Sequence, residues 1–146
     1  MKQLKFAKKI KRLTITTVKK RANTVYSKYI RTRDMLLNKH YGTDTLKCFT
    51  CLKPYVAFGV RCAQAGHFLP GRHSAVLYDE RACHGQCYNC NINLKGNWVK
   101  YEERMIRDYG QAVVDELKTL DRTNPHYKVE DYLEIEEKFI RKLEAL

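Results

Sequence analysis

The chain has 146 residues, six cysteines and a formal net charge of +12. This length fits one domain with appendages, in which a bound metal can supplement a small hydrophobic core. No apolar run approaches the roughly 18 residues that a membrane span requires, and the basic start lacks the apolar segment of a signal peptide, so we expect a cytoplasmic protein without a membrane partner. In a reducing compartment, cysteines indicate metal ligands and free thiols before disulfides.

The positive charge is concentrated at the N-terminal end of the chain. Residues 1–47 hold 14 of the 28 lysines and arginines but only two acidic residues, whereas the charges of residues 48–146 cancel. A polyphosphate partner requires such a basic region, although a run of charge can also be a solvated helix face. We expect DNA contacts from Lys8, Lys9, Lys11, Arg12, Lys19, Lys20 and Lys28.

Four regions follow one another along the chain. Residues 1–13 predict a basic mobile arm that orders on binding. Residues 14–45 predict a basic N-terminal helix, because apolar residues recur at helical spacing over about 16–40 and the lysines lie largely off that stripe. The core spans residues 46–100, in which the short apolar runs 55–58 and 75–78 predict two strands. Apolar stripes in residues 101–146 predict a C-terminal helical region, whose aromatic residues favour a core or dimer seam over stacking platforms.

Two Cys-x-x-Cys motifs, 35 residues apart, are the most informative feature of the chain. Each two-residue spacer brings two thiolates to one ion, so the four cysteines predict one structural zinc in tetrahedral geometry. These ligands are Cys48, Cys51, Cys87 and Cys90. The remaining pair, Cys62 and Cys83, are expected to be small buried residues. The alternative is that either one serves as a ligand at the metal site.

A histidine and an asparagine close to these motifs can carry phosphodiester chemistry. Hydrolysis needs a base that takes a proton from water and a cation near the scissile phosphate. His67 is predicted to be the base, because neutral histidine suits this role near pH 7. Asn91, directly after Cys90, is predicted to hold Mg²⁺ or Mn²⁺ together with phosphate oxygens of the substrate. The four-thiolate zinc has no open position for catalysis.

The order of motif, two strands with His67, motif and a helix that begins with Asn91 is that of the ββα-metal finger of HNH-type endonucleases. The predicted fold class is therefore α+β. It consists of a zinc-stabilised ββα-metal (HNH- or endonuclease VII-like) finger flanked by a long N-terminal helix and C-terminal helices.

Longer sequence runs resemble one family over about residues 46–120. They are Ala65-Gly66-His67-Phe68, the Glu-Arg-x-x-His-x-Gln-Cys spacing of residues 80–87, Lys95-Gly96-Asn97 and the helix of residues 109–117. This pattern resembles the lambdoid phage NinG/Rap recombination endonuclease family, and the phage endonuclease VII group is similar in its cysteine motifs. The resemblance implies a phage or prophage enzyme that acts as a homodimer and nicks branched double-stranded DNA, such as Holliday junctions and D-loops.

Ala82 departs from the pattern of that family, whose members generally carry asparagine here. Alanine has no side-chain hydrogen bond to offer, so any bracing of the loop around the base is lost. Natural divergence and an introduced substitution both explain this residue, and we favour the latter; the chain would then be inactive. The acidic ligand often found before the base is also absent. Asn91 is therefore expected to be the main protein ligand, with His84 either as a helper or as a structural residue.

Arg72, Arg81 and Lys95 are candidate phosphate contacts, although each can be an ordinary solvated charge. The sequence leaves two other functions open. The first is a noncatalytic zinc-finger protein that binds DNA or has a regulatory role, an alternative that Ala82 keeps open. The second is a binder of single-stranded nucleic acid, which would need exposed aromatic residues within the basic surface. Tyr26, Tyr29 and Tyr41 are the candidates for that role.

Overall fold

The computed structural model describes residues 13–38, 44–71 and 75–146, so the expected contacts Lys8, Lys9, Lys11, Arg12 and Arg72 lie outside the described residues. The helices are α2 (Ile15–Leu37), α3 (Trp98–Tyr109), α4 (Gln111–Asp121) and α5 (Val129–Glu144). The strands are β1 (Thr45–Lys47), β2 (Pro54–Val56), β3 (Gln64–His67) and β4 (Cys83–Gln86). The α+β class is confirmed. None of the helices described is long and apolar enough to cross a membrane.

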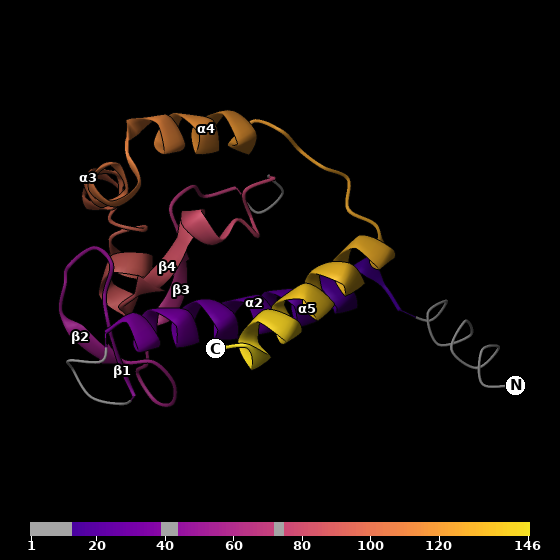
Figure 1. The fold of residues 1–146 in the computed structure, drawn as a ribbon, viewed down its shortest axis with the longest axis horizontal. Coiled ribbons are helices and arrows are strands. Elements are labelled where there is room, and N and C mark those ends of the chain that lie inside the picture. Colours follow the sequence, from indigo (N-terminus) through magenta and orange to yellow (C-terminus); the bar gives the residue numbers. More distant parts are fainter. Residues whose placement is uncertain (1–12, 39–43, 72–74) are drawn as a thin grey trace, which may run out of the picture.

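Helix α2 packs along α5, and the two segments from opposite ends of the chain lie side by side (Figure 1). Thr14 caps α2, because its hydroxyl oxygen accepts a hydrogen bond from the backbone N–H of Thr17 at 3.2 Å. The rings of Tyr26 and Tyr29 are buried against Phe139 of α5. These two tyrosines therefore cannot stack on nucleic-acid bases, and Tyr41 lies outside the described residues.

The strands form two separate antiparallel pairs. Strand β1 pairs with β2, and β3 pairs with β4 so that His67 lies opposite Cys83. The prediction of a strand at residues 75–78 is wrong, because these residues form a turn. The apolar side chains of this turn are nevertheless buried in the hydrophobic cores, namely those of Val76, Leu77 and Tyr78. The sequence did not predict strand β4, because its four residues are small or polar, although all four are buried.

A second core forms where α3 and α4 cover the first cysteine motif. It contains Phe49, Phe68, Tyr101, Met105, Val114 and Leu117. Helix α3 thus buries Tyr101 and Met105, whereas Trp98 at its start is 46% exposed. The element directly after β4 is a single π-helical turn, Asn89–Asn93, which precedes α3. This turn, rather than a full helix, carries Asn91.

Candidate functional site

The four predicted cysteine ligands converge into one cluster. All four sulfur atoms, of Cys48, Cys51, Cys87 and Cys90, lie within 4.8 Å of one another. The Sγ atoms of Cys51 and Cys87 are 3.9 Å apart, close to the roughly 3.8 Å edge of a tetrahedron with Zn–S bonds of about 2.3 Å. The four cysteines could therefore hold a metal such as zinc.

Hydrogen-bond donors point at several of these sulfur atoms. The backbone N–H of Cys87 donates to Cys48 Sγ at 3.3 Å, and the side-chain amide of Asn97 donates to Cys90 Sγ at 3.6 Å. Burial raises the pKa of the Cys48 thiol, but hydrogen bonds from the Thr50 side chain and from nearby backbone groups more than offset it and lower that pKa to about 7. At Cys48 these donors favour thiolate, which is the form that binds a metal, whereas burial raises the pKa of the Cys51 and Cys90 thiols.

A cavity of about 600 Å³ lies beside the cysteine cluster, between α2 and β3. Four residues singled out from the sequence line it, namely His67, Asn91, Lys19 and Lys95. They come from α2, from β3 and from the segment after the second cysteine motif, so the folded chain assembles this group.

His67 is held in one tautomer by the loop that precedes β4. Its Nε2 atom lies 3.0 Å from the carbonyl oxygen of Leu77. Because a carbonyl only accepts, Nε2 must donate its proton, and the lone pair of the neutral ring is on Nδ1. The Tyr26 ring lies roughly parallel to the imidazole, with ring centroids 6.0 Å apart. This contact therefore defines which ring nitrogen is basic when the imidazole is neutral.

The amide of Asn91 is oriented by a residue of β3. Its Nδ2 atom donates to Gln64 Oε1 at 2.8 Å. The amide oxygen accepts no hydrogen bond from the described part of the chain. Amide oxygens are suitable ligands for Mg²⁺ and Mn²⁺. Asn91 can therefore offer one oxygen ligand to a cation.

The charge of the cavity favours an anion. Lys19 and Lys95 contribute ammonium groups, and no carboxylate lines the cavity among the residues described. Lys95 begins a tight turn with a positive φ of 50°, followed by Gly96 at 91° and Asn97 at 49°. A divalent cation would thus depend on Asn91 and on oxygen atoms of a bound phosphate.

His84 lies apart from this cavity. Its ring stacks on Phe49 at 3.9 Å, its Nδ1 lies 3.2 Å from the Arg33 guanidinium, and its Nε2 lies 3.2 Å from the Arg81 carbonyl oxygen and from the Tyr109 hydroxyl. Burial lowers the pKa of His84 to about 4. The structure therefore places His84 as a neutral, hydrogen-bonded core residue and gives it no access to the cavity.

Ala82 and Arg81 are also accounted for by local contacts. Ala82 is 1% exposed and packs in the second core, and its carbonyl oxygen accepts from Phe68 N at 2.8 Å, directly after His67. The Arg81 guanidinium pairs with Asp79 at 2.8 Å and Glu116 at 3.1 Å. Arg81 thus meets carboxylates rather than the cavity.

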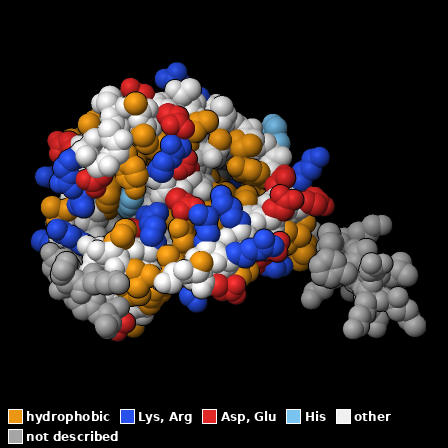
Figure 2. All heavy atoms as spheres, viewed as in Figure 1, with side chains coloured by type: hydrophobic (Ala, Val, Ile, Leu, Met, Phe, Trp, Pro, Cys, Tyr) orange, Lys and Arg blue, Asp and Glu red, His pale blue; other side chains and the backbone are white. Residues whose placement is uncertain are grey.

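The other sequence candidates lie at three kinds of position. Lys20 and Lys28 are exposed on α2. Cys83 is buried opposite His67, and Cys62 is half-buried with its sulfur 3.6 Å from Arg31 Nη1, so neither belongs to the cysteine cluster. On the face shown in Figure 2, lysine and arginine side chains gather over α2 and α5, with acidic side chains between them.

Three residues of the site escaped the sequence analysis. Gln64 orients Asn91 and the Leu77 carbonyl orients His67. The fully buried Gln86 amide donates to Thr50 Oγ1 at 3.0 Å and to the Gly96 carbonyl oxygen at 2.9 Å, which links the first cysteine motif to the Lys95 turn. A Cβ atom on Gly66 would lie 2.0 Å from Gln86 Oε1, so only glycine leaves room for this buried side chain. Gly66, directly before His67, was therefore the sequence signal that could have indicated the position of Gln86.

The family described as Bacteriophage Lambda NinG protein matches residues 1–146. Curated relatives named "Protein ninG" include those of Escherichia phage 933W, 35% identical, Salmonella phage P22, 34% identical, and Escherichia phage lambda, 31% identical, each over 83 residues. These matches cover 56% of this chain and 40–41% of the relatives, so the matched part spans about two fifths of their length. No solved structure matches the chain.

Proposed function

Since the chain belongs to the bacteriophage lambda NinG protein family, we propose that it is a metal-dependent endonuclease that cleaves branched double-stranded DNA, such as Holliday junctions and D-loops. The observation that carries this proposal is the cavity in which His67, Asn91 and two lysines converge. A homodimer would match the two-fold symmetry of a four-way junction. The branched substrate rests on the sequence resemblance described above.

The geometry suggests a role for each residue. His67 Nδ1 takes a proton from a water molecule, whose oxygen then forms a bond to phosphorus while the bond to the leaving oxygen breaks. Lys19 and Lys95 hold the negative phosphate in the cavity. The Asn91 oxygen and phosphate oxygens would hold Mg²⁺ or Mn²⁺, which supplies charge neutralisation at the leaving oxygen. In the cysteine cluster, zinc would stabilise the fold only.

Cleavage of a four-way junction, a D-loop, a single strand and a linear duplex, each with Mg²⁺ or Mn²⁺, tests the proposal. In the chain with Ala82→Asn, His67→Ala and Asn91→Ala should each lower the rate on branched DNA by roughly 10²-fold or more, the usual contribution of a general base or a charge-stabilising group. Zinc content and DNA affinity should change little, because neither side chain ligates the cluster.

Exposed residues of the same types provide matched controls. His126→Ala and Asn93→Ala remove a histidine and an asparagine that lie outside the cavity, and both should cut like the parent. The mechanism would be wrong if His67→Ala cut branched DNA as fast as His126→Ala.

A noncatalytic zinc-containing DNA-binding protein is the second candidate function. Two observations favour it: Ala82 stands where the related family carries asparagine, and the described lining of the cavity has no carboxylate for a cation. Ala82→Asn separates the two functions. If the amide braces the loop that holds His67, junction cleavage should rise by about 10²-fold. A parent and an Ala82→Asn variant that both bind junctions with zinc in place, but never cut, would support the binding protein.

A further inference from the structure

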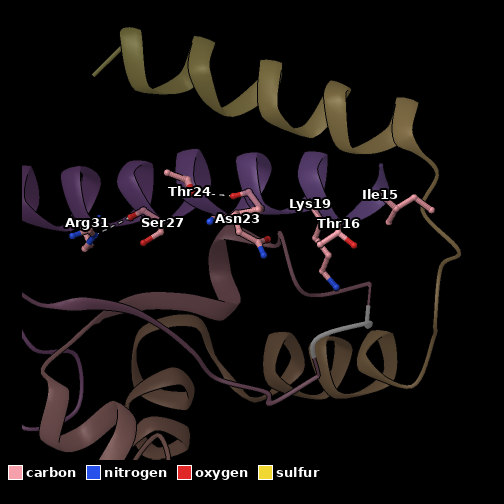
Figure 3. Close-up of a pocket in the computed structure, with 8 residues that line it drawn as sticks. Ile15, Thr16, Lys19, Asn23, Thr24, Ser27 and Arg31 are labelled. Carbon is pink, nitrogen blue, oxygen red and sulfur yellow. Dashed lines mark hydrogen bonds between the residues drawn. The ribbon is translucent and has the colours of Figure 1, made fainter. Parts of the chain in front are cut away.

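A groove of about 720 Å³ runs along one side of α2 (Figure 3). Its polar lining consists of hydroxyl, amide and cationic side chains, with Thr16, Thr24, Asn23, Lys20 and Arg31 among them. Figure 3 shows α5 on the opposite side of α2, so the groove lies away from the core that the two helices share. The described residues leave this side of α2 open as a groove.

The groove adjoins the cavity that contains His67 and Asn91. Lys19, Asn23 and Ser27 line both hollows. They occupy the middle of the groove, because its lining begins at Ile15 and ends at Arg31. A strand bound in the cavity would therefore continue along α2 in both directions.

The chemistry of the groove suits phosphate groups rather than bases. Three cationic residues line it, and the lining has neither acidic nor aromatic residues among those described. Arg31 is preorganised, since its guanidinium donates to the Ala57 carbonyl oxygen at 3.0 Å and lies 4.5 Å from the centre of the Phe58 ring. A single strand would need aromatic platforms for its bases, whereas a duplex backbone needs only cations and hydrogen-bond donors.

We propose that the α2 groove binds the sugar–phosphate backbone of the duplex arm that flanks the cleaved bond. This inference rests on the proposed endonuclease function, which it extends to the DNA beyond the scissile phosphate. The 16 residue steps from Ile15 to Arg31 correspond to about 24 Å of helix, which matches about seven phosphates of one DNA strand. Binding is independent of base sequence, because phosphates carry no sequence information.

Two exposed lysines on helices permit a matched comparison. Lys20 lines the groove, whereas Lys100 of α3 lines neither the groove nor the cavity. Salt titrations of duplex binding by the uncleaving His67→Ala protein would compare Lys20→Ala with Lys100→Ala. Lys20→Ala should reduce the slope of log K against log salt by about 0.9 and weaken binding roughly fivefold at 0.15 M salt. Lys100→Ala should match its parent in both quantities.

A second variant and a modified DNA locate the contact. Thr24→Lys adds a cation to the groove and should steepen the salt slope by a similar amount. Methylphosphonate at single positions within about seven phosphates around the cut should weaken binding by the parent, and one such position should lose its effect in Lys20→Ala.

Equal salt slopes for Lys20→Ala and Lys100→Ala would overturn the inference, as would an effect of Lys20→Ala confined to single-stranded DNA. These measurements need no cleavage, so they remain decisive if the endonuclease proposal fails. Conversely, normal cleavage by Lys20→Ala with an unchanged salt slope would contradict the inference about the groove and leave the proposed endonuclease function intact.

Discussion

At the scale of single residues, a buried polar group attaches β4 to α2. The Asp34 carboxylate accepts hydrogen bonds from Arg33 Nε at 2.8 Å and from the backbone N–H of Gly85 at 2.6 Å. The Arg33 guanidinium also donates to the Cys83 carbonyl oxygen at 2.8 Å and lies against His84. Because buried polar groups are costly unless they are paired, this network fixes the position of β4, which pairs with the strand β3 that contains His67.

His84 should make the stability of the protein depend on pH. Burial lowers its pKa to about 4 in the folded chain, whereas an unfolded histidine has a pKa near 6.5. The unfolded state therefore binds more protons between these values, and the free energy of unfolding should fall as the pH drops below about 6.5. The expected loss from this residue is about 2 kcal/mol at pH 5 and none at pH 7.

Denaturant unfolding of the parent and of His84→Gln, at pH 7 and pH 5 with excess zinc, measures this difference. The variant should lose less stability than the parent between the two pH values, since glutamine does not titrate. Metal loss at low pH would affect both proteins alike. The same decrease in both would show that His84 does not cause the dependence.

At the scale of elements, the strands are too short to be stable alone. Strands β1 and β2 have three residues each, and β3 and β4 have four, while isolated two-stranded sheets are marginal in water. The cysteine cluster joins the turns that follow β1 and β4, and the Phe49 N–H donates to the Gly85 carbonyl oxygen between them at 2.8 Å. A metal at the cluster should therefore contribute directly to folding.

We predict one zinc per chain and a loss of the central fold on chelation at neutral pH. Cys90→Ser should lower both the zinc content and the melting temperature, because it removes one of four thiolate ligands. Cys62→Ser is the matched control, since its sulfur lies outside the cluster. Metal analysis measures the zinc content, and thermal unfolding measures the melting temperature. Freshly purified protein without zinc, or equal effects of the two serine variants, would contradict the assignment.

At the scale of the whole molecule, α2 connects the helical core to the candidate site. One side of this helix packs on α5, and the other lines the cavity and the groove. The net charge of +12 is held by the residues that precede the first cysteine motif. The charge that would attract DNA is therefore carried partly on the helix that lines the cavity and partly on the preceding segment.

Removal of residues 1–13, which contain six lysines and arginines, should weaken DNA binding equally at every sequence. The slope of log K against log salt should decrease by up to about five, since each neutralised phosphate contributes about 0.9. Fluorescence anisotropy at several salt concentrations measures both effects. Replacement of the six basic residues by glutamine keeps the length and should behave as the deletion does. Full affinity with an unchanged slope would mean that this segment makes no phosphate contacts.

The sequence by itself determined the features that local spacing encodes. The Cys-x-x-Cys spacing predicted the four-sulfur cluster around Cys48 and Cys87, and the period of apolar residues predicted α2 and the C-terminal helices. The motifs around His67 also indicated the NinG family, and the family comparison confirms that membership. Such features can be recognised from the sequence alone, because a helix period or a two-residue ligand spacer involves only residues that are close along the chain.

Only the tertiary structure decided which polar residues meet in the cavity. It brought Lys19, His67 and Lys95 together, and it separated Arg81 and His84 from them by pairing one with carboxylates and enclosing the other. It also paired β3 with β4, whose sequence has no strand pattern. These outcomes depend on contacts between residues far apart in the chain, where burial and available partners outweigh local propensity.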